Sequence, residues 1–493
     1  MKKYILSIDQ GTTGSRAFVF NAQGRVVSSA YQEFKQYYPR PGWVEHDAQE
    51  IWDSVDAVIR KAVAVSRIDP KFIAGIGITN QRETTVMWDR QTARPLYRAI
   101  VWQCRRTAGA CTRLKKHEDL FRRTTGLIVD AYFSGTKIQW LLDHVPGLRK
   151  KTAKSRVAFG TIDSWLIYKL TKGAAHVTDM TNASRTLIFD IKAKAWSSPL
   201  LKLLNIPENI LPKVLPSSSV FGYTAQGMAG LPEGIPITAV MGDQQAALYG
   251  QGCFLPGSIK NTYGTGCFML LNTGNKCVYS KKGLLTTLGC DAWGRPVYVL
   301  EGAVFIAGAV VQWLRDELRM VKDSASSEAM INGIEDTNGV YLVPAFVGLG
   351  APYWKADARG IITGLTRGTN ARHIVRAALE SMAYQTKDVF DLMEKESGLQ
   401  IRSLSVDGGA CRNNFLMQFQ ADMLAIPIIR PAMVDSTVAG AAYLAGIASG
   451  LWKPQDVLKI KKIERTFKPR MARAQAKSKY EGWRRAVRQA LAS

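Results

Sequence analysis

The segment ILSIDQGTTGSRAFVF, residues 5–20, constrains the fold most strongly, because it places a Gly/Thr turn between two stretches that favour β-structure. A P-loop would end its Gly-rich run with Lys and then Ser or Thr, and a dinucleotide-binding fingerprint would lead into a helix. The run at residues 11–14 is followed instead by β-branched and aromatic residues. The sequence therefore predicts a β-hairpin whose turn offers hydroxyls and backbone N–H groups to a phosphate.

The second half of the chain repeats this arrangement. A short apolar strand is predicted at 237–241, and the segment IKNTYGTGCFMLL, residues 259–271, again puts a Gly-Thr-Gly turn between two strands. Further on, residues 404–414 end a strand with Asp-Gly-Gly and pass into a helix. This weak duplication, in a chain of 493 residues, predicts two similar domains, 1–250 and 251–493, around a central cleft.

The rest of the N-terminal half alternates between strand and helix patterns. Strands are predicted at 4–8, 15–20, 25–34, 73–79, 84–88 and 98–102. Asp47 and Glu50 resemble a capping box at the start of a first helix, and further helices are predicted near 105–117 and 136–144. This alternation predicts the α/β class.

Cysteine and histidine usage argues against several kinds of site. The seven cysteines form no C-x-x-C pair, and the five histidines lie in unrelated contexts, so neither a zinc cluster nor a Ser-His-Asp triad is indicated. Asp9 interrupts the first apolar run well before the length of a signal peptide, and segments 302–311 and 339–354 are too short or too broken to span a bilayer. We therefore expect a cytoplasmic protein with reduced thiols, no membrane insertion, and chemistry that depends on carboxylates, arginines and backbone groups.

The net charge of +25 raises the question of a nucleic-acid partner. The tail, residues 453–493, contains 13 Lys and Arg against 3 Asp and Glu, and residues 149–156 form a second basic cluster. Neither region interleaves its basic residues with aromatic side chains that would stack on bases. The charge pattern favours a solvated basic helix face, and no nucleic-acid partner is expected.

Three aspartates each follow an apolar strand, which places them where α/β folds bind ligands: Asp9, Asp243 and Asp407. Asp243 stands in the sequence GDQQ, and phosphoryl transfer to an alcohol needs one carboxylate near the attacking hydroxyl. The alternative for each is a turn or helix cap. For Asp407 the cap and the functional role have equal weight. The glycines beside it are more informative than the carboxylate, because they let the backbone approach a flat ligand such as adenosine.

An acceptor pocket is predicted from three segments of the N-terminal half. The sequence ITNQRET places Arg82 beside Glu83 just after a strand, which in isolation would be read as a surface ion pair. The sequences VWQCRR and DAYFSGTK add Trp102 and Tyr132 as walls. Together they predict a polar pocket with aromatic sides.

These motifs together resemble the FGGY carbohydrate kinases, within the actin/hexokinase/heat-shock ATPase superfamily. The resemblance covers almost the whole chain and rests on an ordered set of segments: SIDQGTTGSR, PGWVEHD, ITNQRET, AIVWQCRR, YFSGTKIQWLLDH, TNASRT, GDQQAALYGQ, NTYGTGCFML, LEGAVF, GAPYW and DGGACRNNFLMQFQ. It implies two actin-like, ribonuclease H-like α/β domains flanking a catalytic cleft, with ATP and Mg²⁺ as cofactors. Within the family, the segments NQRE and WQCRR indicate glycerol as the acceptor rather than xylulose, ribulose or gluconate.

The resemblance also implies roles for particular residues. The glycerol site corresponds to Arg82, Glu83, Tyr132, Asp243 and Gln244, with Trp102 and Phe268 covering the carbon backbone. The nucleotide site corresponds to Thr12, Thr13, Gly14, Arg16, Thr265, Gly308, Gln312, Gly409 and Asn413. Mg²⁺ is expected near Asp9 and Asp243, and Asp243 is the expected catalytic base.

Two departures from the family pattern stand out. Gly14 occupies a position where many relatives carry Ser, which removes one hydroxyl that could contact a phosphate. Residues 226–236 contain neither the Arg-bearing loop that binds a phosphosugar inhibitor in some bacterial relatives nor the His that is phosphorylated in others. The second departure predicts that regulation through this segment is absent.

The expected reaction is transfer of the ATP γ-phosphoryl group to glycerol, giving sn-glycerol 3-phosphate and ADP. One alternative is another polyol or ketose kinase of the same family, and another is a non-catalytic relative that binds ATP as a chaperone or binding protein. Asp243, Arg82 and Glu83 argue against the second alternative. The expected partners are glycerol, ATP and further copies of the chain in a dimer or tetramer.

Overall fold

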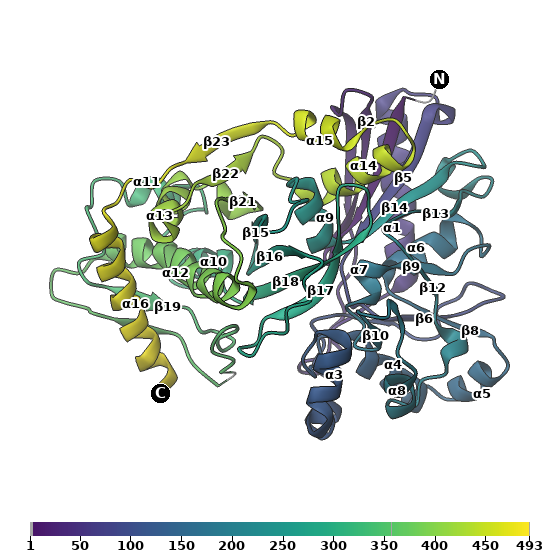
Figure 1. The fold of residues 1–493 in the computed structure, drawn as a ribbon, viewed down its shortest axis with the longest axis horizontal. Coiled ribbons are helices and arrows are strands. Elements are labelled where there is room, and N and C mark those ends of the chain that lie inside the picture. The colour runs from purple at the N-terminus through teal and green to yellow at the C-terminus, as the bar shows by residue number, and fades with distance from the viewer. Residues whose placement is uncertain (1–2, 356, 493) are drawn as a thin grey trace. The chain divides into compact units, whose positions relative to one another are not determined.

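The computed structural model describes residues 3–355 and 357–492, which divide into two compact units (Figure 1). The first unit comprises Met1–Phe254, Thr286–Tyr298 and Ser436–Ile460. The second comprises Leu255–Leu285, Val299–Asp435 and Lys461–Ser493. The α/β class predicted from the sequence is confirmed, because each unit is built on a mixed sheet covered by helices.

The first unit is organised by a six-stranded mixed sheet. Its order is β13 (Ser218–Tyr223), β14 (Pro236–Gly242), β5 (Ile73–Asn80), β1 (Tyr4–Gln10), β2 (Gly14–Asn21) and β3 (Val26–Glu33). Strand β5 runs parallel to both β1 and β14, with Asn80 in register with Gln10 and with Gly242. The carboxyl ends of these three strands therefore meet at one edge, where α/β sheets place ligands.

Two helices cover this sheet. Helix α1 (Ala48–Ser66) packs on β2 and β3, and the Asp47 carboxylate caps it by accepting the N–H groups of Gln49 and Glu50. Helix α14 (Ser436–Ala448) packs on β1, β5 and α9 (Asp243–Gly250). The prediction of a capping box is wrong for Glu50. Its side chain does not bond back to the Asp47 N–H but accepts a hydrogen bond from the Tyr37 hydroxyl.

The remaining elements of the first unit are short. The helices are α2 (Ala108–Leu114), α3 (Glu118–Thr125), α4 (Ser134–His144), α5 (Leu148–Ala153), α6 (Ile162–Leu170), α7 (Met180–Ala183), α8 (Ser198–Leu203) and α15 (Pro454–Ile460). The strands are β4 (Glu45–His46), β6 (Val86–Asp89), β7 (Ala99–Ile100), β8 (Val157–Gly160), β9 (Val177–Asp179), β10 (Phe189–Asp190), β11 (Ala195–Trp196) and β12 (Lys213–Leu215). The predicted strand 98–102 is shorter than expected, because the chain turns where Cys104 N–H bonds the Val101 carbonyl.

Most strands of the second unit belong to one seven-stranded sheet. It runs in the order β17 (Leu285–Cys290), β18 (Pro296–Val304), β16 (Cys267–Gly274), β15 (Ile259–Tyr263), β21 (Leu404–Asp407), β22 (Ile428–Pro431) and β23 (Ile463–Phe467). The main helices are α10 (Gly308–Asp316), α12 (Ala371–Ser397), α13 (Asn414–Leu424) and α16 (Arg473–Ala492), with α11 (Ser326–Met330) and the pair β19 (Tyr341–Val343) and β20 (Ile361–Thr363). Strand β15 pairs antiparallel with β16 and parallel with β21, so the predicted second hairpin is confirmed.

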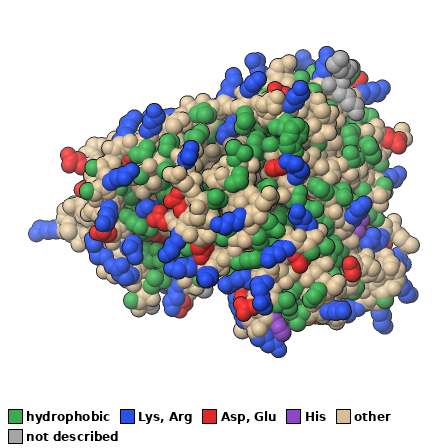
Figure 2. Space-filling model, viewed as in Figure 1, with side chains coloured by type: hydrophobic (Ala, Val, Ile, Leu, Met, Phe, Trp, Pro, Cys, Tyr) green, Lys and Arg blue, Asp and Glu red, His purple; other side chains and the backbone are tan. Residues whose placement is uncertain are grey.

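The basic tail is part of this second core. Trp483 of α16 is fully buried and donates from its indole N–H to the Asp388 carboxylate at 2.9 Å, and Tyr480 donates to the other oxygen of the same carboxylate. The basic tail therefore does contain aromatic residues among its Lys and Arg residues. These two aromatic side chains pack into the core and are not exposed for stacking on bases. Figure 2 shows Lys and Arg side chains spread over the visible face among acidic and apolar ones.

None of the helices in the described ranges combines the length and the apolar character needed to cross a membrane.

Candidate active site

The first hairpin turns tightly at the edge of the sheet in the first unit. The Gly11 N–H donates to the Gly14 carbonyl at 2.9 Å, which closes the turn that carries Thr12 and Thr13. Asp9 lies opposite Arg16 across β1 and β2, and the guanidinium contacts the carboxylate at 2.8 Å. The sequence interpretation gave these two charges separate roles, whereas the structure pairs them with each other.

The absence of a side chain at Gly14 has a local reason. A Cβ atom at this position would lie 2.5 Å from Cε2 of Tyr31 and 2.8 Å from the Gln32 carbonyl oxygen. The Gln32 oxygen belongs to the backbone of the paired strand β3, so it cannot move aside cheaply. Tyr31 and the paired strand therefore fill the space that a Ser side chain would need.

A buried arginine connects the ends of β5 and β14. The Arg82 Nε atom lies 3.1 Å from Oδ1 of Asp243 and 3.8 Å from Oε1 of Glu83, and its Nη1 donates to the Gln245 side chain at 3.3 Å. The Arg82 side chain is 2% exposed, while the Asp243 side chain is 31% exposed. The predicted pair Arg82 and Glu83 is therefore buried and does not form a surface ion pair.

Asp243 opens helix α9, directly after Gly242. Its Oδ1 accepts the N–H of the next residue, Gln244, at 2.7 Å and also forms the ion pair with Arg82. The N-cap of α9 is Gly242, and no side chain caps this helix, so the helix-cap alternative considered for Asp243 is wrong. The second oxygen, Oδ2, is the one left for other chemistry.

Glu83 has an unusual backbone conformation for a buried acidic residue. Its φ angle is +60°, and its carbonyl accepts hydroxyl groups from Ser134 at 2.9 Å and from Thr85 at 3.1 Å. Left-handed non-glycine residues that the surroundings hold in place concentrate at functional sites. The nearest cation to its carboxylate is Arg185, whose Nε donates to Oε1 at 2.6 Å with both side chains buried.

Arg185 was not among the predicted site residues, although the segment TNASRT that contains it was part of the family resemblance. The structure places its guanidinium 5.4 Å from the ring centre of Tyr132 and 5.2 Å from that of Phe133. It therefore contacts two predicted pocket residues, Glu83 and Tyr132. The burial of Arg185 and its pairing with Glu83, 102 residues away, come from the fold and are not marked in the sequence.

The aromatic wall of the pocket is held from behind. Tyr132 packs edge-on against Trp102 with ring centres 5.6 Å apart. The Tyr132 N–H donates to the Asp130 carboxylate at 2.8 Å, and the Tyr132 carbonyl accepts a hydrogen bond from the ammonium group of Lys137. Lys137 is buried, and this burial lowers its pKa to about 8. The Trp102 indole N–H donates to the Thr12 hydroxyl at 3.0 Å, which links this wall to the first hairpin.

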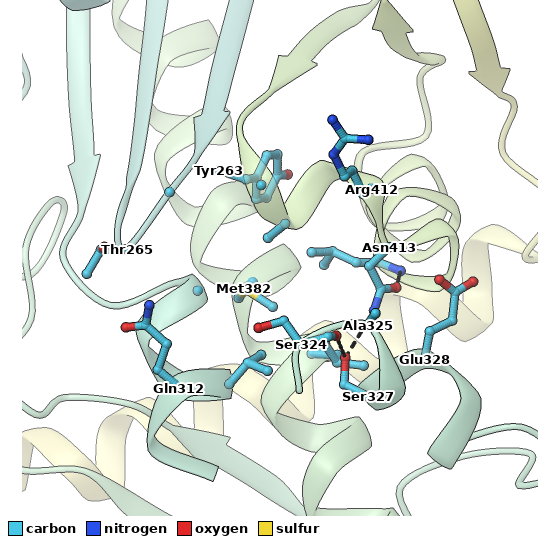
Figure 3. Close-up of a pocket in the computed structure, with 17 residues that line it drawn as sticks. Tyr263, Thr265, Gln312, Ser324, Ala325, Ser327, Glu328, Met382, Arg412 and Asn413 are labelled. Atoms are coloured by element: carbon cyan, nitrogen blue, oxygen red, sulfur yellow. Dashed lines mark hydrogen bonds between the residues drawn. The ribbon is translucent and has the colours of Figure 1, made fainter. Parts of the chain in front are cut away.

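The second unit contains a cavity of about 410 Å³ beside its own Gly/Thr turn (Figure 3). Five predicted nucleotide residues line it: Thr265, Gly308, Gln312, Gly409 and Asn413. The Gly308 N–H donates to the Gly264 carbonyl at 3.0 Å, and a Cβ at Gly308 would approach that oxygen to 2.6 Å. Glycine there lets the start of α10 lie directly against the turn.

The opposite side of this cavity contains residues that the sequence did not predict. Figure 3 shows Ser324, Ser327 and Glu328 near Asn413, and the guanidinium of Arg412 points away from them. The Asn413 Oδ1 caps α13 by accepting the Leu416 N–H at 2.9 Å, and its Nδ2 lies 3.5 Å from the Ser327 hydroxyl. No motif in the sequence marked this short helical segment.

The glycines after β21 differ in their surroundings. A Cβ at Gly408 would lie 2.4 Å from the Tyr263 carbonyl oxygen, and φ there is +84°. A Cβ at Gly409 would meet nothing within 4 Å, because that residue borders the cavity. Close contact with the Tyr263 backbone therefore explains the glycine at 408. The backbone that a flat ligand could approach, as the sequence predicted, is that of Gly409.

The predicted residues fall into two sets by unit. The first unit contains Asp9, Thr12, Thr13, Gly14, Arg16, Arg82, Glu83, Trp102, Tyr132, Asp243 and Gln244. The second contains Phe268, half-buried on β16, with the five residues that line the cavity. Many residues of each set lie at turns or strand ends, whereas Tyr132 precedes α4 and Gln312 lies within α10.

A divalent cation fits the carboxylates of the first unit. No cluster of three or more His, Cys, Asp or Glu side chains suited to a metal ion occurs in residues 3–355 and 357–492. Mg²⁺ does not need one, since it binds through one or two carboxylates, water and substrate phosphates. Asp9 is 2% exposed, and its Oδ2 accepts hydrogen bonds from Arg16 at 2.8 Å and from the Thr437 hydroxyl at 2.9 Å. The Asp243 side chain is 31% exposed and is the more accessible of the two carboxylates.

Comparison with known proteins gives a consistent match along the chain. Residues 4–250 match the N-terminal domain of the FGGY family of carbohydrate kinases, and residues 259–449 match its C-terminal domain. Glycerol kinase 2 of Thermotoga maritima is 55% identical over 492 residues, which cover 99% of both chains.

Solved structures agree with this match. The crystal structure of Plasmodium falciparum glycerol kinase with ADP has a TM-score of 0.94 and 36% identity, covering 99% of this chain and 98% of that one. A xylulose kinase from Brucella ovis has a TM-score of 0.86 at 24% identity, covering 98% of each chain, which indicates a shared fold.

Proposed function

The chain belongs to the FGGY family of carbohydrate kinases, and from this premise we propose that it transfers the γ-phosphoryl group of ATP to glycerol, giving sn-glycerol 3-phosphate and ADP. One observation carries the proposal at the level of the site: buried Arg82 lies 3.1 Å from Asp243 and 3.8 Å from Glu83 at the end of two parallel strands. This arrangement offers both donors and acceptors to a polyol. The similar proteins named glycerol kinase, at 54–55% identity over the full length, support the choice of acceptor.

In this proposal the residues of the first unit bind and align glycerol. Arg82 and Glu83 hydrogen-bond two of its hydroxyls, and Tyr132 and Gln244 complete the polar side of the pocket. Trp102 lies along the carbon backbone, and Phe268, which belongs to the second unit, is assigned to the same role. Asp243 accepts the proton of the attacking hydroxyl through Oδ2, because its Oδ1 is already bonded to Arg82 and to the Gln244 N–H.

The phosphates of ATP are assigned to the two Gly/Thr turns, and the adenosine to the cavity of the second unit. Thr12, Thr13 and Thr265 supply hydroxyls, and backbone N–H groups supply further donors. Asp9 and Asp243 would hold Mg²⁺, which neutralises negative charge on the phosphates. Most of the rate enhancement then comes from alignment and from fixed charges that need no rearrangement.

The experiment that tests this proposal is ADP release measured with a panel of acceptors. Glycerol should give the highest kcat/KM, and xylulose, ribulose and gluconate should give little turnover. Preference for one of these sugars would favour the alternative polyol or ketose kinase. Binding of ATP without acceptor-dependent ADP release would favour the non-catalytic alternative.

We also propose the cellular and domain assignments that follow from this activity. The enzyme acts in the cytoplasm, where ATP is available, and six of its seven cysteines are buried. Residues 1–250 provide the acceptor pocket, and residues 251–493 provide the nucleotide cavity. A homo-oligomer, either a dimer or a tetramer, remains the expected assembly.

Insensitivity to fructose 1,6-bisphosphate is the first prediction. Residues 226–236 contain no Lys or Arg, so an anionic bisphosphate has no cation of this segment to bind. Arg60 of α1 lies against Gly230, but its guanidinium already contacts the Asp56 carboxylate at 2.6 Å. We expect unchanged ADP release at millimolar bisphosphate, and inhibition that persists after changes in this segment would contradict the reasoning.

The second prediction concerns the basic tail. Arg473, Lys477 and Arg488 of α16 are exposed, so changing all three to Gln should leave kcat within about twofold and the thermal midpoint nearly unchanged. A useful comparison is Arg465→Gln, because Arg465 donates to the Asn414 side chain at 3.2 Å, next to the nucleotide cavity. Loss of turnover in the triple variant with its fold intact would show that the tail takes part in catalysis.

A further inference from the structure

Arg185 lies behind the proposed glycerol pocket and contacts two of its walls. Its side chain is fully buried, its Nε donates to Glu83 Oε1 at 2.6 Å, and its guanidinium stacks over the rings of Tyr132 and Phe133. Its backbone N–H donates to the Asn182 carbonyl at 3.0 Å, which anchors it in the turn after α7. One cation thus contacts both an acidic and an aromatic residue assigned to the acceptor.

The two buried arginines divide their contacts. Arg82 lies closer to Asp243, at 3.1 Å, than to Glu83, at 3.8 Å, whereas Arg185 bonds Glu83 at 2.6 Å. Arg185 therefore makes the shorter of the two arginine contacts with the Glu83 carboxylate.

Glu83 needs such a partner in order to bind a hydroxyl. A carboxylate that is 1% exposed loses most of its hydration, so it stays charged only beside a cation. Its backbone is already held by Ser134 and Thr85, which leaves the side-chain torsions as the remaining freedom. The bond to Arg185 removes that freedom and directs the carboxylate.

Acceptor specificity follows from this arrangement. A site built to hydrogen-bond a substrate hydroxyl rejects analogues that lack it, because its own buried polar group is then left unpaired. From these contacts, and resting on the function proposed above, we infer that Arg185 is a positioning residue that sets acceptor specificity by holding Glu83 and Tyr132 against the triol. Arg185 itself need not touch the substrate.

The test compares Arg185→Met, which removes the charge, with Arg185→Lys, which keeps it. Arg376→Met is the matched control, because Arg376 is also buried, bonds a buried carboxylate, Glu380, at 2.9 Å, and stacks over the ring of Phe415 in the second unit. For each protein, kcat/KM is measured with glycerol, propane-1,2-diol and propane-1,3-diol, together with KM for ATP and the thermal midpoint. The two diols each lack one hydroxyl of glycerol.

We expect Arg185→Met to lower kcat/KM for glycerol by about 10- to 100-fold, the effect of losing one hydrogen bond to a charged group. The glycerol-to-diol ratio should fall by about tenfold for the diol that lacks the hydroxyl bound by Glu83, while KM for ATP changes by less than about twofold. Arg185→Lys should recover part of the ratio. Arg376→Met should lower the midpoint and leave the ratio unchanged.

An unchanged ratio in folded Arg185→Met would overturn the inference, and if that variant does not fold, an unchanged ratio in Arg185→Lys would overturn it equally. Equal losses for all three acceptors would assign Arg185 a general structural role. These outcomes leave the proposed function intact if the wild-type protein phosphorylates glycerol. If the wild-type protein fails to do so, the proposed function falls, and this inference falls with it.

Discussion

Asp243→Asn is expected to lower kcat by ~10² to 10⁴ while the fold and ADP affinity persist. The Gln244 N–H and Arg82 both contact Oδ1 of Asp243, and the amide oxygen of Asn accepts both bonds. The substitution therefore removes only the charge and basicity associated with Oδ2. An amide aligns a hydroxyl but cannot take its proton.

The measurements are glycerol-dependent ADP release, ADP affinity and the thermal midpoint. Asp47→Asn is the control, because the Asp47 carboxylate also accepts a backbone N–H at the start of a helix, that of Gln49 at 2.8 Å, and Asn caps helices nearly as well as Asp. The control should retain normal kcat. If Asp243→Asn also retains near-normal turnover, Asp243 is only the start of α9 and another group accepts the proton.

Arg82→Ala is expected to lower kcat/KM for glycerol by about 10²- to 10³-fold, with ADP affinity little changed. The change removes a buried guanidinium that contacts Asp243, Glu83 and Gln245. Glu83 keeps its bond to Arg185, whereas Asp243 loses its nearest cation. The structure therefore predicts a fall in kcat as well as a rise in KM for glycerol.

Arg82→Lys separates charge from geometry in this prediction. An ammonium group restores the positive charge but cannot reproduce the planar set of donors that reaches two carboxylates and an amide. We expect it to recover part of kcat and little of KM. Equal weakening of glycerol and ADP binding in Arg82→Ala would move Arg82 out of the acceptor pocket to a position that serves both ligands.

Local sequence patterns predicted the turns and strand ends well. Both Gly/Thr hairpins were predicted from glycines flanked by β-branched and aromatic residues, and both form, as β1–β2 and β15–β16. The apolar run that ends at Gly242 predicted a strand followed by Asp243, and strand β14 does end at Gly242. These features depend on a few consecutive residues, so they can be predicted without knowing the rest of the fold.

The cavity of the second unit was partly predictable for the same reason. Thr265 and Gly409 belong to turns that the sequence marks, and both line the cavity. Ser327 and Glu328 were missed, because they come from a short helix with no recognisable pattern. Glu328 accepts the Asn414 N–H at 3.0 Å across 86 residues, a contact that only packing produces.

The sequence by itself determined the α/β class, the two hairpins, and the carboxylates and arginines available to the site, because each depends on local pattern or residue type. The division between 1–250 and 251–493 stays a prediction. Only the tertiary structure decided which charges pair: Arg185 with Glu83 across 102 residues, and the Thr437 hydroxyl with Asp9 across 428. The packing of helices on a sheet decides which side chains come together. A buried carboxylate then pairs with the cation that lies nearest, because burying an unpaired charge costs free energy.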